Sequence, residues 1–174
     1  MTGTGVGPEL IRLNNVNARY DHNLVLEDVS FHVHEDQFTG IVGPSGAGKT
    51  TLIDVLLGVL NSDSGSVLIS GIPPLQAIAK WPGAISYVPQ DVVISNGTIR
   101  ENVGLGFNSE YVSEELVWDA IKAAQLDGYV NSLPLGLETQ VGERGTRMSG
   151  GQRQRLGIAR ALFTRPKLLV LDEA

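Results

Sequence analysis

The feature that most constrains this chain is a glycine-rich segment of eight residues, from Gly43 to Thr50. It matches the pattern G-x-x-x-x-G-K-[ST] at every position. Glycines let the backbone turn so tightly that successive N–H groups point at one anion, and the N-terminus of a following helix adds to that attraction. An apolar segment at 38–42 precedes the loop and a helical pattern at 50–60 follows it. The pattern therefore predicts a strand, a phosphate-binding loop and a helix in succession.

Two side chains of this segment fit a nucleotide with its metal ion. In such a loop the Lys49 ammonium contacts the β- and γ-phosphates, and the Thr50 hydroxyl is a ligand of Mg²⁺. A chance glycine-rich turn is the alternative interpretation. Since a strand before the loop and a helix after it are the required setting, we expect ATP and Mg²⁺ as ligands.

A pair of acids follows an apolar segment near the end of the sequence. Residues 168–171 are all apolar and predict a buried strand, and Asp172 and Glu173 come directly after it. Ligands gather at the carboxyl ends of parallel strands, so Asp172 is expected beside the phosphate loop, where it holds Mg²⁺ through water. Glu173 is the candidate general base that polarises the attacking water. The alternative is a solvated acidic turn.

A second candidate anion site lies at Ser149-Gly150-Gly151-Gln152, where a helix that reaches Phe163 begins. Bare amides, a hydroxyl and a helix N-terminus suit an anion, although an ordinary N-cap serine has the same appearance. Seven of the thirteen basic residues lie between Arg144 and Lys167, uninterrupted by an acid. One interpretation of these basic residues is a patch that binds nucleic acid. We favour the other, in which the arginines face solvent, neighbouring acids or a nucleotide, because the net charge of the chain is −6 and aromatic residues are scarce in this segment.

The remaining pattern predicts an α/β protein. Apolar residues alternate at 11–20 and 29–33, which predicts two antiparallel strands, and further strands are expected at 66–70 and 85–88. Residues 98–124 have a helical pattern, with Ser113 as an N-cap and with Val117, Ala120, Ile121 and Ala124 on one face. Residues 133–147 read as a loop.

Composition narrows the class of protein. With 174 residues and 42% hydrophobic residues, the chain can bury the core of one globular domain. It has no cysteine, which excludes disulfides and thiolate metal sites. No segment approaches the length of a membrane span, and residues 1–8 lack the features of a signal peptide.

Taken together, these motifs resemble the nucleotide-binding domain of ABC transporters, from about Ile11 to Ala174. Residues 43–52 resemble the Walker A loop, 148–155 the signature motif, and 168–174 the Walker B strand with its catalytic glutamate. The resemblance implies a P-loop NTPase core of the RecA-like kind, with an N-terminal antiparallel β subdomain and a helical insert. As a single partial domain (1–174), it would divide into a β subdomain with the Walker A core (9–90), a helical subdomain (91–147), and the signature helix with the Walker B strand (148–174).

The resemblance also assigns roles to individual residues. Gln90 matches the glutamine that senses Mg²⁺ and the membrane domain, and Tyr20 matches the aromatic residue that stacks on adenine, with a core or edge-strand tyrosine as its alternative. It implies catalytic roles for Glu173, Lys49 and Gln90, and Mg²⁺ ligation by Thr50, Gln90 and Asp172. The implied ATP-binding residues are Tyr20, Gly43, Pro44, Ser45, Gly46, Ala47, Gly48, Lys49, Thr50 and Thr51, and, from a second domain, Ser149, Gly150, Gly151 and Gln152.

Two segments narrow the subtype. Residues 97–103 and 139–145 resemble exporter-type sequences. In exporters the second segment lies near the coupling helices of the membrane domain. The resemblance therefore implies that Glu143 transmits movement between the domains and has no catalytic role. The implied function is an ATP hydrolase that powers transport from the cytoplasmic face of a plasma or inner membrane. Its expected partners are a transmembrane domain, fused or separate, and a second ATPase domain in a head-to-tail dimer; no nucleic acid is expected.

The end of the sequence departs from the family pattern. The family continues with further strands and a switch histidine, whereas all three histidines here precede the phosphate loop. We therefore expect a fragment whose C-terminal strands are missing, with marginal stability and weak or no ATP turnover by itself. A soluble ABC ATPase outside transport and a truncated module that only binds ATP remain the alternatives.

Overall fold

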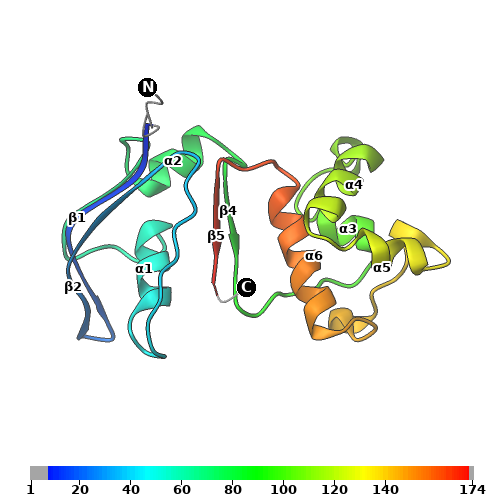
Figure 1. Ribbon diagram of the computed structural model, residues 1–174, viewed down its shortest axis with the longest axis horizontal. Coiled ribbons are helices and arrows are strands. Elements are labelled where there is room, and N and C mark those ends of the chain that lie inside the picture. Colours follow the sequence, from blue (N-terminus) through cyan, green and yellow to red (C-terminus); the bar gives the residue numbers. More distant parts are fainter. Residues whose placement is uncertain (1–7, 173–174) are drawn as a thin grey trace, which may run out of the picture. The chain divides into compact units, whose positions relative to one another are not determined.

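The computed structural model describes residues 8–172, without the side chain of Arg144 (Figure 1). Its contacts divide it into two compact units, one up to Pro82 and one from Gly83. The first unit contains β1 (Glu9–Tyr20), β2 (Asn23–His34), α1 (Lys49–Leu56), β3 (Ser64–Ile69) and α2 (Pro74–Lys80). The second contains β4 (Ile85–Val88), α3 (Ile99–Val103), α4 (Glu114–Ala123), α5 (Asp127–Ser132), α6 (Gly150–Leu162), β5 (Leu168–Leu171) and short 3₁₀ turns at Ser109–Tyr111, Gly136–Glu138 and Glu143–Gly145.

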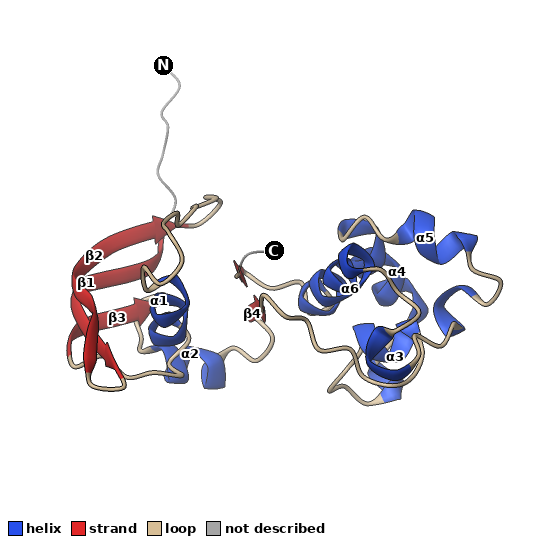
Figure 2. Cartoon of the chain, turned by 90° about the horizontal axis from the view of Figure 1, so that it is seen from below, coloured by secondary structure: helices blue, strands red, loops and turns tan. Residues whose placement is uncertain are grey.

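The first unit is an antiparallel sheet with a helix packed on one face. The strand order is β2-β1-β3, and β1 pairs antiparallel with both neighbours. The buried residues of β1 alternate in two runs, Ile11 with Leu13 and Val16 with Ala18, because side chains of a strand point to opposite faces. A shift in the register between Leu13 and Val16 separates the two runs. α1 packs against this sheet (Figure 2) and buries Leu52, Ile53, Val55 and Leu56. The predicted antiparallel pair is therefore confirmed.

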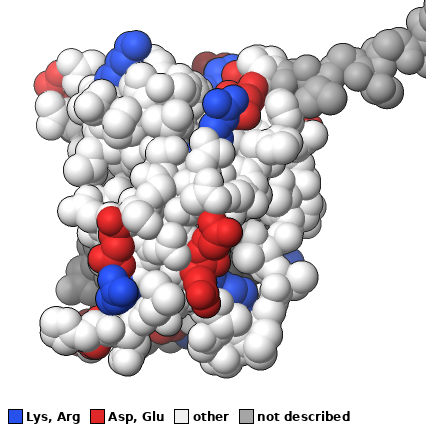
Figure 3. Space-filling view, turned by 90° about the vertical axis from the view of Figure 1, so that its left-hand side faces the viewer, with Lys and Arg blue, Asp and Glu red and all other residues white. Residues whose placement is uncertain are grey.

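The surface of this sheet carries charges of both signs. Arg12 pairs with Glu9 at 2.6 Å, and Arg19 pairs with Asp63 at 3.3 Å. The hydrogen bond and charge of Glu9 raise the pKa of Arg12. Basic and acidic side chains adjoin one another on this face of the first unit (Figure 3). Solvent screens such exposed pairs and they contribute little, so burial in the core is the main source of stability.

The second unit contains a helical cluster and a pair of parallel strands. Val117, Ala120, Ile121 and Ala124 are buried together in α4 and its C-terminal end, as their spacing predicts. They pack with residues from α3, α5 and α6, including the fully buried Leu156. β4 and β5 are parallel, and Val88 lies opposite Leu171. The strands predicted at 85–88 and 168–171 and the helix after Ser149 are confirmed.

Three details of the predicted secondary structure are wrong. Residues 37–44 contain no strand, and Phe38 and Val42 are 96% and 94% exposed. A strand forms only where another strand pairs with its backbone, and the β2-β1-β3 ladder does not include this segment. The helix expected to reach residue 60 ends at Leu56, before a turn at Gly58 with φ +72°. The helical pattern at 98–124 is interrupted between α3 and α4, where Gly106 has φ +91°.

The buried face of α4 generates a stability prediction. Ile121 is 0% exposed, whereas its neighbour Lys122 is exposed on the same helix. Replacing Ile121 with alanine leaves a cavity, and we expect the free energy of unfolding to fall by about 2–5 kcal/mol. Lys122→Ala, the control, should change it by less than about 0.5 kcal/mol. Denaturant titration followed by circular dichroism measures both values, and equal effects of the two variants would contradict this packing.

Candidate functional site

The loop at 43–50 leads directly into α1 and lies open to solvent. Residues 43–47 are exposed, and Gly48 forms the N-cap of α1. The Lys49 Nζ donates to the carbonyl oxygens of Gly43 at 2.9 Å and Pro44 at 3.0 Å. The ammonium group therefore spans the loop and lies over it. The first turn of α1 contains no acidic residue of its own to offset the positive end of the helix.

Gly48, at the N-cap of α1, has a backbone conformation and surroundings that favour glycine. Its φ is +84°, in the left-handed region, and an added Cβ would lie 2.9 Å from Val25 Cγ1. The same Cβ would lie 3.3 Å from the Val25 carbonyl oxygen. The loop is thus held against β2, where the close approach of the two backbones leaves no room for a side chain.

The other predicted nucleotide residues of the first unit lie near its strand and helix ends. Thr50 is exposed in the first turn of α1, and Thr51 is half-buried beside it. Tyr20 ends β1, where it pairs with Asn23 across the turn, and is 56% exposed. This exposure excludes the core tyrosine of the alternative interpretation, and it is compatible both with stacking on a base and with an exposed strand tyrosine.

The parallel strands β4 and β5 bring Gln90 and Asp172 to the same edge. Asp172 directly follows β5 and Gln90 comes two residues after β4, so both lie past paired carboxyl ends. Asp172 is 6% exposed, and its N–H donates to the Val88 carbonyl at 3.0 Å. The Tyr87 hydroxyl donates to Asp172 Oδ2 at 3.4 Å. Gln90 is exposed, and Glu173 lies outside the described residues.

The start of α6 is capped as the sequence predicts. The Gln152 N–H donates to Ser149 Oγ at 3.3 Å, and the Ser149 N–H donates to Gln152 Oε1 at 2.8 Å. This reciprocal capping box satisfies two amides, while Gly150 and Gly151 are exposed beside it. Unlike α4, which has Glu114 and Glu115 in its first turn, α6 has no acid there. The electrostatic field of this N-terminus therefore remains available to an external anion.

The arginines that follow Ser149 bind neighbouring groups of the chain. Arg153 donates to the Met148 carbonyl at 2.7 Å, Arg155 to the Gln125 carbonyl at 3.0 Å, and Arg165 pairs with Asp119 at 2.7 Å. Arg160 donates to oxygens of Asn102 and Val93. The pair Arg165–Asp119 agrees with the interpretation that these arginines face neighbouring acids, whereas Arg153, Arg155 and Arg160 bind oxygens of the backbone or of an amide instead.

One buried polar residue was not identified from the sequence. Asn102 is 0% exposed and its amide binds the backbone of Ser95 and Thr98. The Thr98–Glu101 capping box around it follows the S/T-x-x-E pattern and is visible in the sequence. The contact between Asn102 and Arg160 joins residues 58 apart, and no local pattern indicates it.

The candidate residues are distributed over both units. Tyr20 and the loop at 43–51 belong to the first unit. Gln90, Asp172 and the start of α6 belong to the second, where Gln90 and Asp172 share one sheet edge. The N-termini of α1 in the first unit and α6 in the second are exposed and have no acid in their first turns, a lack that α2 shares. The second unit also has the buried carboxylate of Asp172 at a strand end.

Comparisons with known proteins agree with this geometry. A family model described as ABC transporter matches residues 26–174. The chain is 42% identical over 166 residues to the ABC transporter ATP-binding protein YwjA of Bacillus subtilis, covering 94% of this chain and 28% of that protein. It is 41% identical over 162 residues to a multidrug resistance ABC transporter ATP-binding and permease protein of Lactococcus lactis, covering 92% of this chain and 27% of that protein.

A solved structure has the same fold. It is described as a bacterial Atm1-family ABC exporter with ATP bound, and it superposes with a TM-score of 0.83 at 33% sequence identity. The match covers 99% of this chain and 31% of the other. The chain thus spans less than a third of the length of these relatives. The expected α/β fold, a P-loop core with an N-terminal antiparallel sheet, is confirmed.

The Gly48 geometry generates the prediction for this site. Gly48→Ala forces a side chain into the left-handed region and against Val25, so we expect unfolding free energy to fall by about 1–3 kcal/mol. Gly40→Ala is the matched control, since an added Cβ there meets nothing within 4 Å, and its effect should stay below about 0.5 kcal/mol. Thermal unfolding of both variants tests this, and a Gly48→Ala chain as stable as the control would contradict the described loop.

Proposed function

The chain belongs to the ABC transporter family, and from this we propose that it binds and hydrolyses ATP to power export across a membrane. The observation that carries the proposal is the pair of exposed, acid-free helix N-termini, at the 43–50 loop and at Ser149. Two anion sites on one chain fit a composite ATPase site, in which the loop of one domain and Ser149 of another enclose the same nucleotide.

The residues of the loop fit the phosphates of ATP. Gly43, Gly46, Ala47 and Gly48 have little or no side chain, so backbone N–H groups can approach an anion closely. Lys49 already lies over the loop, where its ammonium would bind phosphate oxygens in place of the carbonyl oxygens it now contacts. Pro44, Ser45 and Thr51 complete the loop, and the exposed ring of Tyr20 would stack on the base.

Three oxygen-bearing side chains are proposed as Mg²⁺ ligands on the chemistry of their donor atoms. The proposed ligands are the Thr50 hydroxyl, the Gln90 amide oxygen and the Asp172 carboxylate, and hard oxygen donors are the ligands this ion prefers. A bound Mg²⁺ ion would neutralise part of the phosphate charge. The Tyr87 hydroxyl orients the Asp172 carboxylate by its hydrogen bond, and Glu173 is the proposed base that removes a proton from the attacking water.

The exposed N-terminus of α6 supports a proposal about the partner domain. We propose a head-to-tail dimer in which Ser149, Gly150, Gly151 and Gln152 contact the nucleotide held by the other domain's loop. Burial of ATP between two domains joins them, and hydrolysis adds the charge repulsion that separates them. This exchange between two arrangements would drive the transport cycle.

The description of a relative supports a proposal about the membrane partner of this chain. The Lactococcus lactis relative is described as an ATP-binding and permease protein, so ATPase and membrane parts occur together there. Within residues 8–172 we find no helix with the length and apolar character that a bilayer crossing requires. We propose that a transmembrane domain, fused or separate, holds this chain at the cytoplasmic face of the membrane. Residues 139–145, with Glu143, would lie near it and transmit its movement.

Two N-cap serines provide a matched test. Ser149 and Ser113 both accept a hydrogen bond of 3.3 Å from the third amide of their helix, so either alanine variant should lower unfolding free energy by about 1 kcal/mol. Because only Ser149 is proposed to contact nucleotide, only Ser149→Ala should weaken ATP-dependent dimerisation, by about ten-fold, and lower ATP turnover.

The assay uses the protein as its gene encodes it, with dimerisation followed by analytical ultracentrifugation and turnover by phosphate release. Ser113→Ala is the control for the loss of a cap alone. Equal effects of the two variants on dimerisation, or an absence of turnover in the unmodified protein, would contradict the proposed function.

A further inference from the structure

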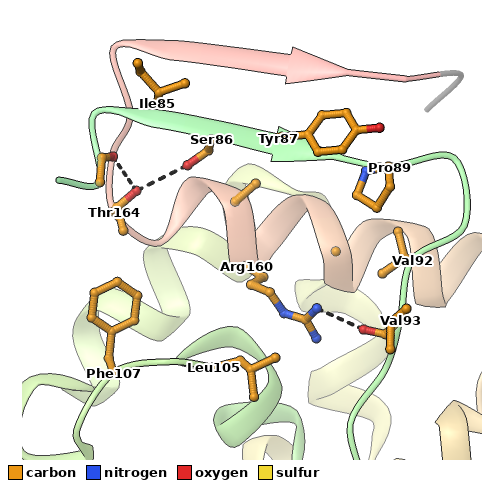
Figure 4. Close-up of a pocket in the computed structure, with 13 residues that line it drawn as sticks. Ile85, Ser86, Tyr87, Pro89, Val92, Val93, Leu105, Phe107, Arg160 and Thr164 are labelled. Carbon is orange, nitrogen blue, oxygen red and sulfur yellow. Dashed lines mark hydrogen bonds between the residues drawn. The ribbon is translucent and has the colours of Figure 1, made fainter. Parts of the chain in front are cut away.

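The side chain of Arg160 joins α6 to two other segments of the second unit. Its Nε donates to the Asn102 carbonyl at 2.8 Å, Nη1 to the Val93 carbonyl at 2.9 Å and Nη2 to Asn102 Oδ1 at 3.1 Å. Figure 4 shows the guanidinium directed at Val93, beside an open cavity of about 360 Å³. All three partners are uncharged oxygens, and burial lowers the pKa of Arg160. The planar fork of the guanidinium is suited to reaching several fixed oxygens at once.

Asn102 is the other half of this connection. Its Nδ2 donates to the carbonyls of Ser95 at 2.9 Å and Thr98 at 3.0 Å, and its Oδ1 accepts from the Ser95 N–H at 2.9 Å as well as from Arg160. Both donors and both lone pairs of the side-chain amide are therefore used. The Asn102 carbonyl lies in the last turn of α3, where carbonyl groups lack intrahelical partners and a cation is favourable. Arg160 thus caps α3.

A second contact fixes the same segment on α6. Gly157 lies three residues before Arg160, on the same face of the helix. An added Cβ at Gly157 would lie 2.6 Å from both methyl groups of Val92. The segment 92–95 is therefore held at Val92 by packing on the α6 backbone, at Val93 by Arg160, and at Ser95 through Asn102.

This segment begins two residues after Gln90, and α6 begins at Ser149. We propose that Arg160 is a positioning residue, which holds residues 92–95 and α3 on α6 so that Gln90 and the Ser149 site keep one fixed geometry. The inference rests on the proposed function, since it assigns Gln90 to the metal ion and Ser149 to the second nucleotide. The 43–50 loop itself belongs to the other unit, and none of the contacts of Arg160 described above involves it.

Arg160→Lys tests the connection itself. Lysine keeps the charge but has one nitrogen, which cannot replace three donors directed at two segments. We expect amide hydrogen exchange at residues 93–95 to accelerate about ten-fold, while the interior of α6 keeps its protection. Arg165→Lys is the matched control, since Arg165 pairs with the exposed Asp119, and it should leave exchange at 93–95 within about two-fold. Unchanged exchange at 93–95, or a uniform increase over the whole second unit, would overturn the proposal.

The kinetics of ATP hydrolysis distinguish a residue that positions other groups from one that binds the nucleotide. In the protein as its gene encodes it, Arg160→Lys should lower kcat for ATP hydrolysis about ten-fold and leave KM within about two-fold, whereas Arg165→Lys changes neither. A parallel rise in KM, or an unchanged kcat, would overturn the proposal. If the unmodified protein does not hydrolyse ATP, the proposed function fails, while the hydrogen-exchange result still decides the connection.

A second pair of variants tests the attachment of the same segment to α6 in case Arg160→Lys fails to fold. Gly157→Ala should displace segment 92–95 through its clash with Val92, although alanine favours the helix by about 1 kcal/mol. Adding Val92→Ala removes the clashing methyl groups and should return exchange at 93–95 and kcat to within about two-fold of the unmodified values. A double variant as impaired as Gly157→Ala alone would contradict the assigned contact.

Discussion

Backbone N–H groups at helix N-termini are the constraint on which the rest of this structure depends. The first amides of any helix have no acceptor within it, so a side chain, solvent or a ligand must supply one. α4 uses Ser113 with Glu114 and Glu115 in its first turn. α1 and α6 have no acid there, and α1 also has no capping side chain, since Gly48 occupies that position. A phosphate group would supply the negative charge that the first turns of these two helices lack.

The surrounding structure holds these two N-termini in fixed positions. At α1, the left-handed Gly48 brings the loop into contact with Val25 of β2, and the helix buries its apolar face on the sheet. At α6, Leu156 and Ala159 are fully buried, and Arg160 binds α3 and the segment after Gln90. β5 follows α6 and places Asp172 beside the end of β4. The exposed polar groups are thus presented by rigid, well-packed elements, as a binding site requires.

Sequence patterns correctly predicted those helices and strands whose formation depends mainly on residues close together in the sequence. The alternation in β1 and β2, the Ser149 cap of α6 and the apolar run of β5 depend on neighbours in sequence, and these predictions are confirmed. The strand at 38–42 was wrong because pairing depends on a partner elsewhere in the fold. α2 was not predicted, although Pro74 stands at its first position, which suits proline. The Asn102–Arg160 contact joins distant residues, so only the structure reveals it. The roles of individual site residues in binding ATP and Mg²⁺ stay predictions.

The most direct test of the account is a calorimetric titration of the chain with MgATP. Since Lys49 is the cation that lies over the loop, we predict one ATP bound per chain and a loss of affinity of about ten-fold or more in Lys49→Ala. The exposed Lys122→Ala should bind as the unmodified chain does. Equal affinity of the unmodified chain and Lys49→Ala would contradict the claim that the 43–50 loop holds the nucleotide.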